Sequence, residues 1–169
     1  LKETLDEVSK GLENYELDKA TRPIGDFVDD LSTWYVRRSR DRFKEEGEEK
    51  EKARETLRFV MLELSKSIAP FMPFLAEDIY KKCGGEKESV HLDEWPKNPP
   101  AGEQNPKFII DNMAEVRKIV SLALEARMKA GIKVRQPLFN LKVKNQNGKM
   151  AEEFLKLIKE EINVKSAIF

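Results

Sequence analysis

The strongest constraint on this chain is the recurrence of apolar residues every three or four positions over most of its length. Residues 17–35 place eight apolar side chains in a stripe about 120° wide when about 100° is assigned to each residue. Similar stripes run through residues 2–14, 53–68, 73–83 and 106–130. Amphipathic helices of this kind must bury their apolar faces against one another. The sequence therefore predicts a mainly α fold built as a helix bundle with short loops.

Prolines and glycines set the expected ends of these helices. The segment from Leu17 is expected to continue as one helix to about Lys44, with Pro23 as a kink or a junction. The next helix should stop at Pro70, and Pro73 can occupy the first turn of the helix that follows. The residues of that helix expected to face inward are Phe74, Leu75, Ile79 and Tyr80.

The periodicity changes in the last part of the chain. Residues 84–106 are interpreted as a long connection, and the helix that opens at Asn105–Pro106 should stop at Gly131. Alternation from Phe139 then predicts a strand, which a turn at Asn147–Gly148, a short helix and a second strand follow. We expect a helical domain over 1–137 and the start of a small, truncated α/β unit over 138–169.

Composition excludes several classes of function. The chain of 169 residues has 31 Lys and Arg against 31 Asp and Glu, so any polyanion site must come from a local cluster. Cys83 and His91 are single residues of their types, too few for a His/Cys zinc cage, and no Gly-rich phosphate loop is present. No apolar run has the length of a membrane span. We expect no catalytic, cofactor or metal site here, no membrane partner and a cytoplasmic location.

The densest local charge follows the aromatic pair Trp34–Tyr35. Residues 37–44 hold five basic side chains and one acid, and the basic positions replace the apolar stripe, as if the helix ran past the edge of the bundle. Guanidinium groups suit phosphate because their forked donors match its oxygens. This first basic cluster consists of Arg37, Arg38, Arg40, Arg42 and Lys44; Arg37, Arg40 and Lys44 share one narrow stripe, and Arg38 and Arg42 continue the apolar one.

A solvated helix end is the alternative interpretation of this cluster. Residues 45–52 carry five acids and two bases, which can partly neutralise it. Trp34 and Tyr35 are candidate stacking platforms for unpaired bases, although their place on the apolar stripe favours packing in the core. A second basic cluster lacks acids altogether and straddles a predicted helix end. It consists of Arg127, Lys129, Lys133 and Arg135.

Four motifs, in order, resemble isoleucyl-tRNA synthetases. DFVDDLSTWYVRRSR at 26–40 is similar to the helix that marks their anticodon-binding domain, and APFMPFLAE at 69–77 resembles a signature shared with the valyl and leucyl enzymes. SVHL with EWP, within 89–96, and AGIKVRQPL at 130–138 again resemble the isoleucine enzyme. The four cover about residues 15–138. Leu64–Ser67 resembles the tail of a catalytic signature of these enzymes, but it falls in the middle of a predicted helix and is interpreted as chance.

The resemblance implies an all-α domain that docks on the anticodon stem-loop of isoleucine tRNA. The parent enzyme would use ATP to ligate isoleucine to its tRNA, whereas this stretch would bind without catalysing. Its expected partners are isoleucine tRNA and the remaining domains of the parent. The expected tRNA-binding residues are Trp34, Arg37, Arg38, Arg40, Arg42, Lys44, Lys129, Lys133 and Arg135. The alternatives are the matching domain of a valyl, leucyl or methionyl enzyme, or a helical protein-interaction scaffold.

Overall fold

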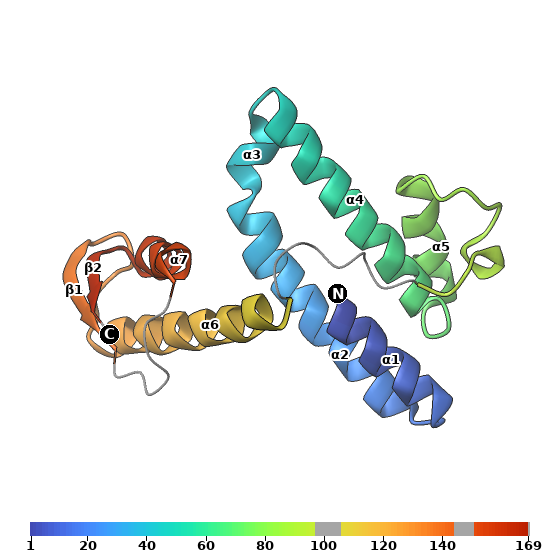
Figure 1. The fold of residues 1–169 in the computed structure, drawn as a ribbon, viewed down its shortest axis with the longest axis horizontal. Helices are drawn as coiled ribbons and strands as arrows, with labels where there is room; N and C mark the ends of the chain where they lie inside the picture. The colour runs from blue at the N-terminus through green and yellow to red at the C-terminus, as the bar shows by residue number, and fades with distance from the viewer. Residues whose placement is uncertain (97–105, 144–150, 169) are drawn as a thin grey trace. The chain divides into compact units, whose positions relative to one another are not determined.

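The computed structural model describes residues 1–96, 106–143 and 151–168, and these ranges form a mainly α structure with a small parallel sheet (Figure 1). The predicted fold class is thereby confirmed. The chain divides into two compact units, Leu1–Pro100 and Ala101–Phe169. This boundary differs from the expected one at 137, because the helix before the first strand packs against the helix between the two strands. We describe each unit by itself.

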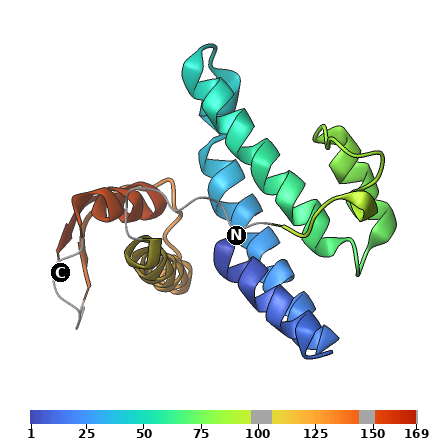
Figure 2. The ribbon, with the colours of Figure 1, turned by 45° about the vertical axis from the view of Figure 1, so that its right-hand side comes forward.

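Helices joined by short turns make up the N-terminal unit. The first two pack side by side, the second continues into a third, and the chain then reverses so that the fourth packs on the third and the fifth on the fourth (Figures 1 and 2). The elements are α1 (Lys2–Glu13), α2 (Leu17–Asp30), the π-helical segment η1 (Leu31–Val36), α3 (Arg40–Lys44), α4 (Glu48–Ile68) and α5 (Pro73–Lys82).

The core of this unit lies where α1, α2, α4 and α5 contact one another. Val8, Ile24, Ile68 and Tyr80 are all at most 7% exposed there. Gly11 allows the close approach of α1 to α2, because a Cβ at this position would lie 2.8 Å from the Cβ of Ala20. Apolar burial of this kind contributes about 25 cal/mol per Å² and holds the helices together.

The buried face of α5 differs from the predicted one. Ala76 and Tyr80 are fully buried, whereas Phe74 is 91% exposed and Leu75 is 47% exposed. Ala76 and Tyr80 stand four residues apart on one helix face, and Phe74 and Leu75 lie on the other sides of the helix. The prediction that Phe74 and Leu75 face inward is therefore wrong, whereas the predicted start of the helix at Pro73 is confirmed.

The connection after α5 is tied down through two side chains of that helix. Glu77 accepts hydrogen bonds from the backbone N–H of Val90 (2.8 Å) and the hydroxyl of Ser89 (3.0 Å), next to the short 3₁₀ helix η2 (Val90–Leu92). Tyr80 donates to Asp93 at 2.7 Å. Residues 97–105 of the predicted connection, including the Asn105 cap, lie outside the described residues.

The C-terminal unit joins one long helix to a strand–helix–strand segment. The two strands are parallel, with Leu138 opposite Val164, and Phe154, Ile158 and Ile162 of the intervening helix are buried. The predicted strands and helix are confirmed, and the predicted turn at Asn147–Gly148 lies outside the described residues. The elements are α6 (Pro106–Lys129), β1 (Leu138–Lys142), α7 (Glu152–Ile162) and β2 (Val164–Ile168).

Candidate nucleic-acid interface

The first basic cluster lies where the second helix changes its geometry. The chain leaves α2 through the π-helical segment η1 and passes the buried Ser39, with φ −84° and ψ 2°, before α3 begins. The single α-helix predicted from Leu17 to Lys44 is therefore wrong. A π-helical turn contains more residues than an α-helical turn, so angular positions assigned from about 100° per residue do not hold beyond Leu31.

Exposure divides the cluster into two groups. Arg37, Arg40 and Lys44 are exposed, whereas Arg38 and Arg42 are half-buried. Two of the exposed members contact residues of their own segment. The Nε of Arg37 donates to the carbonyl oxygen of Thr33 at 2.6 Å, and Lys44 lies 3.9 Å from the Asp41 carboxylate. Exposed ion pairs of this length contribute little, about 0–1 kcal/mol, so a phosphate can replace the carboxylate at small cost.

An acidic residue of the following helix reaches Arg42. The guanidinium of Arg42 lies 3.5 Å from Glu49 of α4, and its Nε is buried without a hydrogen-bond partner. The predicted partial neutralisation by residues 45–52 is thus present at Arg42. The cluster does not extend past the edge of the bundle, because α3 packs against α4.

The two aromatic residues before the cluster behave differently. The hydroxyl of Tyr35 donates to the carbonyl oxygen of Ala53 in α4 at 3.3 Å, so this ring joins two helices and is not free to stack on a base. Trp34 is half-buried in η1. Trp34 is therefore the stacking candidate of the pair, because the ring of Tyr35 is held to α4.

The second basic cluster separates into one buried residue and three exposed residues. Arg127 in the last turn of α6 is 4% exposed, and its guanidinium donates to backbone carbonyls, so it has no surface to offer to RNA. Lys129 pairs with Glu125 at 2.6 Å on the exposed helix face. Lys133 and Arg135 are exposed on the loop that connects α6 to β1.

Each cluster belongs to a different compact unit. The first cluster lies directly after η1 and on α3, and the second lies at the end of α6 and on the loop after it. Each is a candidate surface on its own unit. Each places three exposed cations close to a helix end.

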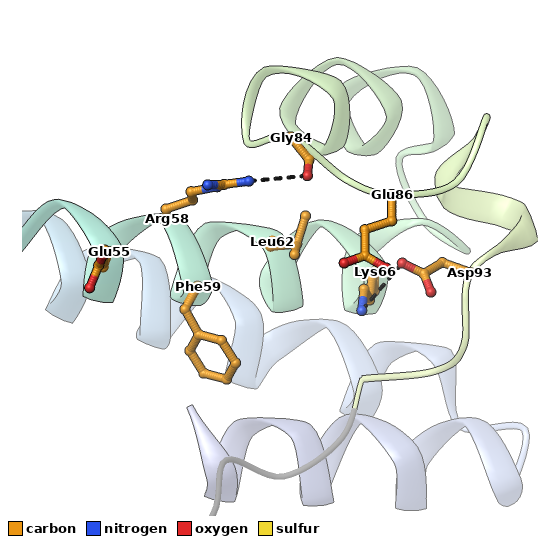
Figure 3. Close-up of a pocket in the computed structure, with 8 residues that line it drawn as sticks. All are labelled: Glu55, Arg58, Phe59, Leu62, Lys66, Gly84, Glu86 and Asp93. Carbon is orange, nitrogen blue, oxygen red and sulfur yellow. Dashed lines mark hydrogen bonds and ion pairs between the residues drawn. The ribbon is translucent and has the colours of Figure 1, made fainter.

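A pocket beside α4 and α5 is the alternative candidate site (Figure 3). It has a volume of about 400 Å³ and is lined by Glu55, Arg58, Phe59, Leu62, Lys66, Gly84, Glu86 and Asp93. Arg58 donates to the carbonyls of Cys83 (2.6 Å) and Gly84 (3.3 Å), and so caps the end of α5.

Lys66 is also engaged within the protein. It lies 3.0 Å from Glu63 and 3.3 Å from Asp93. Burial disfavours its charge, but the hydrogen bonds and the charges of these two carboxylates outweigh burial and raise the pKa of Lys66. The two cations of the pocket are thus used to join α4 to the end of α5 and to the connection. This arrangement is a structural network, and we place no ligand there.

Other candidate chemistry is not assembled in the described parts of the chain. The segment Leu64–Ser67 lies inside α4 with Ser65 and Ser67 fully buried, so it is not a mobile catalytic loop. His91 is exposed in η2. In residues 1–96, 106–143 and 151–168, His, Cys, Asp and Glu do not gather in groups that could hold a metal. None of the helices there is long and apolar enough to cross a membrane.

Sequence reasoning missed two supporting contacts. Arg127 donates to the backbone carbonyl of Ile162, and the Nδ2 of Asn163 donates to the carbonyl oxygen of Val134 at 3.0 Å. Counting charges places Arg127 with the exposed cations of its cluster. Its spacing carried the opposite signal, since it continues the positions of Val116, Val120 and Ala123 on α6, two of which are buried. Asn163 has no such signal, because its role depends on a left-handed backbone conformation with φ 51°.

A mainly helical fold with exposed arginines and lysines at helix ends defines a class of protein: a helical module with surfaces suited to a polyanion such as RNA. Comparison with known proteins is more specific. Residues 1–144 match the family described as the anticodon-binding domain of tRNA ligase. The chain belongs to this family.

Three individual relatives are isoleucine–tRNA ligases. The chain is 39% identical to the isoleucine–tRNA ligase of Deinococcus radiodurans over 173 residues, which covers 100% of the chain and 16% of that protein. It is 40% identical to the enzymes of Chlamydia pneumoniae and Bacillus thuringiensis strain Al Hakam, with 96% and 98% of the chain covered and again 16% of each relative. The chain thus spans 16% of the length of these relatives.

Proposed function

We propose that this chain is the anticodon-binding part of an isoleucine–tRNA ligase and docks on the anticodon stem-loop of isoleucine tRNA. The observation that carries the proposal is the 39–40% identity to isoleucine–tRNA ligases over nearly the whole chain. The exposed side chains of Arg37, Arg40 and Lys44 on one unit, and of Lys133 and Arg135 on the other, supply chemistry suited to RNA.

In the proposed mechanism, contacts to phosphates position the tRNA and contacts to bases identify it. Guanidinium and ammonium groups at the helix ends contact phosphates and set the register of the stem-loop. Splayed anticodon bases supply identity by stacking and by hydrogen bonds on their edges, and a stacked base contributes about 1–3 kcal/mol. Trp34 is the candidate stacking residue. Isoleucine activation with ATP and transfer to tRNA would take place in other domains of the whole enzyme.

Salt dependence of tRNA binding tests the role of the first basic cluster. We expect Arg37→Gln with Arg40→Gln to weaken binding and to reduce the slope of log K against log salt by about 0.7–0.9 for each lost phosphate contact. The matched control is Lys19→Gln with Arg22→Gln, which makes the same charge change at exposed positions of α2. Equal slopes for the two double variants would show that the cluster is only a solvated helix end.

An anticodon exchange tests the identity of the tRNA. Transcripts of isoleucine tRNA that carry a valine, leucine or methionine anticodon should bind more weakly than the parent transcript. Preference for one of the exchanged anticodons would instead favour the domain of that other ligase.

Exposed apolar residues at the start of α5 support a second role as a protein-interaction surface. Met72 is 46% exposed, and Phe74 and Leu75 are even more exposed. In the proposed parent, the remaining domains of the synthetase are the expected partners. Rescue of aminoacylation by adding this chain to a ligase that lacks the domain, and loss of rescue with Phe74→Ser, would support this role. Full rescue by that variant would contradict it.

A further inference from the structure

The guanidinium of Arg127 holds three chain segments together through backbone carbonyls. Its Nη1 donates to Lys133 at 3.1 Å, and its Nη2 donates to Gln136 at 3.0 Å, Ile162 at 2.8 Å and Asn163 at 3.1 Å. These acceptors come from the loop before β1 and from the end of α7. Within the described residues no carboxylate pairs with this cation. The negative end of the α7 dipole and the carbonyl oxygens compensate its charge instead.

Asn163 completes the arrangement from the other side. It caps α7 in the left-handed conformation, and its Nδ2 donates to the carbonyl oxygen of Val134 at 3.0 Å. Three carbonyls of the loop, those of Lys133, Val134 and Gln136, are therefore drawn inward. The side chains of Lys133 and Arg135 remain exposed. We call Arg127 and Asn163 the carbonyl clamp.

We propose that the carbonyl clamp preorganises the loop of residues 131–137 for RNA, so that Arg127 and Asn163 are positioning residues that set tRNA affinity without touching tRNA. The inference rests on the proposed function. A loop whose backbone is already fixed does not have to be ordered when tRNA binds, so Lys133 and Arg135 meet a phosphate at a lower entropic cost. The clamp also gives a role to the end of α7, which lies beyond the residues 1–144 that match the family.

Two conservative variants of the whole chain test the clamp. Arg127→Lys keeps the charge but replaces a planar fork by a point donor that cannot reach four acceptors. Asn163→Gly keeps the left-handed backbone and removes only the donor to Val134. For both we expect faster hydrogen exchange at the amides of Ile132 and Gln136 and about tenfold weaker binding to isoleucine tRNA, with the salt slope unchanged. Lys133→Gln with Arg135→Gln should instead lower the slope.

The readouts separate positioning from stability. A residue that only stabilises the unit would lower the melting temperature and leave Kd unchanged well below it. Asn163→Gly keeps the test decisive if Arg127→Lys fails to fold. Unchanged tRNA affinity despite faster exchange at Ile132 and Gln136 would overturn the inference and leave the proposed function intact. If the unsubstituted chain does not bind tRNA, both the inference and the proposed function are overturned. Hydrogen exchange at the two amides would still report whether the clamp orders the loop.

Discussion

Arg42 of α3 and Glu49 of α4 lie 3.5 Å apart across the turn that joins the two helices. The acid comes from the run that follows the first basic cluster, so the protein neutralises part of its own candidate RNA surface. Glu49 also lies 3.5 Å from Lys52, so Arg42 and Lys52 share the negative charge of this one carboxylate. The pair is half-exposed, and its strength is that of a surface ion pair.

Release of Arg42 should strengthen RNA binding. We expect Glu49→Gln to raise the affinity for isoleucine tRNA about two- to threefold at low salt, because a surface pair contributes about 0.2–1 kcal/mol. Titration of labelled tRNA at two salt concentrations measures this. Glu46→Gln removes the same charge from the turn beside the cluster and is the matched control. Equal gains for both variants would mean that net charge matters and the pairing of Arg42 does not.

The hydroxyl of Tyr35 should contribute to stability and not to RNA binding. Tyr35→Phe removes the hydrogen bond to Ala53 and is expected to lower the free energy of unfolding by about 1 kcal/mol. Urea unfolding measures this, with Tyr15→Phe as the control, because Tyr15 is 93% exposed. Affinity for tRNA should stay within twofold of the parent. A large loss of affinity at full stability would mean that the hydroxyl of Tyr35 itself contacts tRNA.

The Glu77 carboxylate should make the N-terminal unit sensitive to acid. The hydrogen bond from Lys81, followed by that from the Val90 N–H, lowers the pKa of Glu77 to about 2 from 4.5. The charged form is therefore favoured in the folded state. Its stabilising contribution is complete above pH 4.5 and is lost as the pH falls through about 2.

Glu77→Gln should flatten this dependence. Unfolding can be followed by the fluorescence of Trp34 and Trp95, both in the N-terminal unit. The variant should be less stable than the unsubstituted chain at pH 6, and the difference in the free energy of unfolding should shrink between pH 4.5 and 2. Glu13→Gln, at an exposed position of α1, should follow the parent at every pH. A constant difference between Glu77→Gln and the parent over this range would contradict the assignment.

Periodicity and proline positions predicted most of the fold because they act locally. Pro70 and Pro73 fix the end of α4 and the start of α5, and the spacing of Phe154, Ile158 and Ile162 predicts α7. Phe74 could not be placed in this way, since exposure depends on which neighbours cover α5. The π-helical segment could not be predicted from the sequence either, because its apolar residues fit an α-helical pattern equally well.

The candidate site shows the same limit. Charge counting located both basic clusters but grouped Arg127, which binds carbonyls, with cations that face solvent. The helical spacing of Arg127 carries a signal of its burial, but its acceptors at Ile162 and Asn163 lie 35 and 36 residues further along the chain. Contacts over this distance depend on tertiary structure, so the partners of Arg127 leave no local pattern.

Gly11 and Gly25 should respond in opposite directions to the same substitution. A Cβ at Gly11 would lie 2.8 Å from both the Cβ and the backbone nitrogen of Ala20, so Gly11→Ala must push α1 away from α2 and is expected to cost about 1–3 kcal/mol. Gly25 has nothing within 4 Å of an added Cβ, and Gly25→Ala should stabilise the interior of α2 by about 0.5–1 kcal/mol. Both positions are helical, so the gain in helix propensity is common to them and the difference isolates the contact. Thermal unfolding of the two variants measures it, and a Gly11→Ala variant as stable as Gly25→Ala would show that the two helices do not pack this closely.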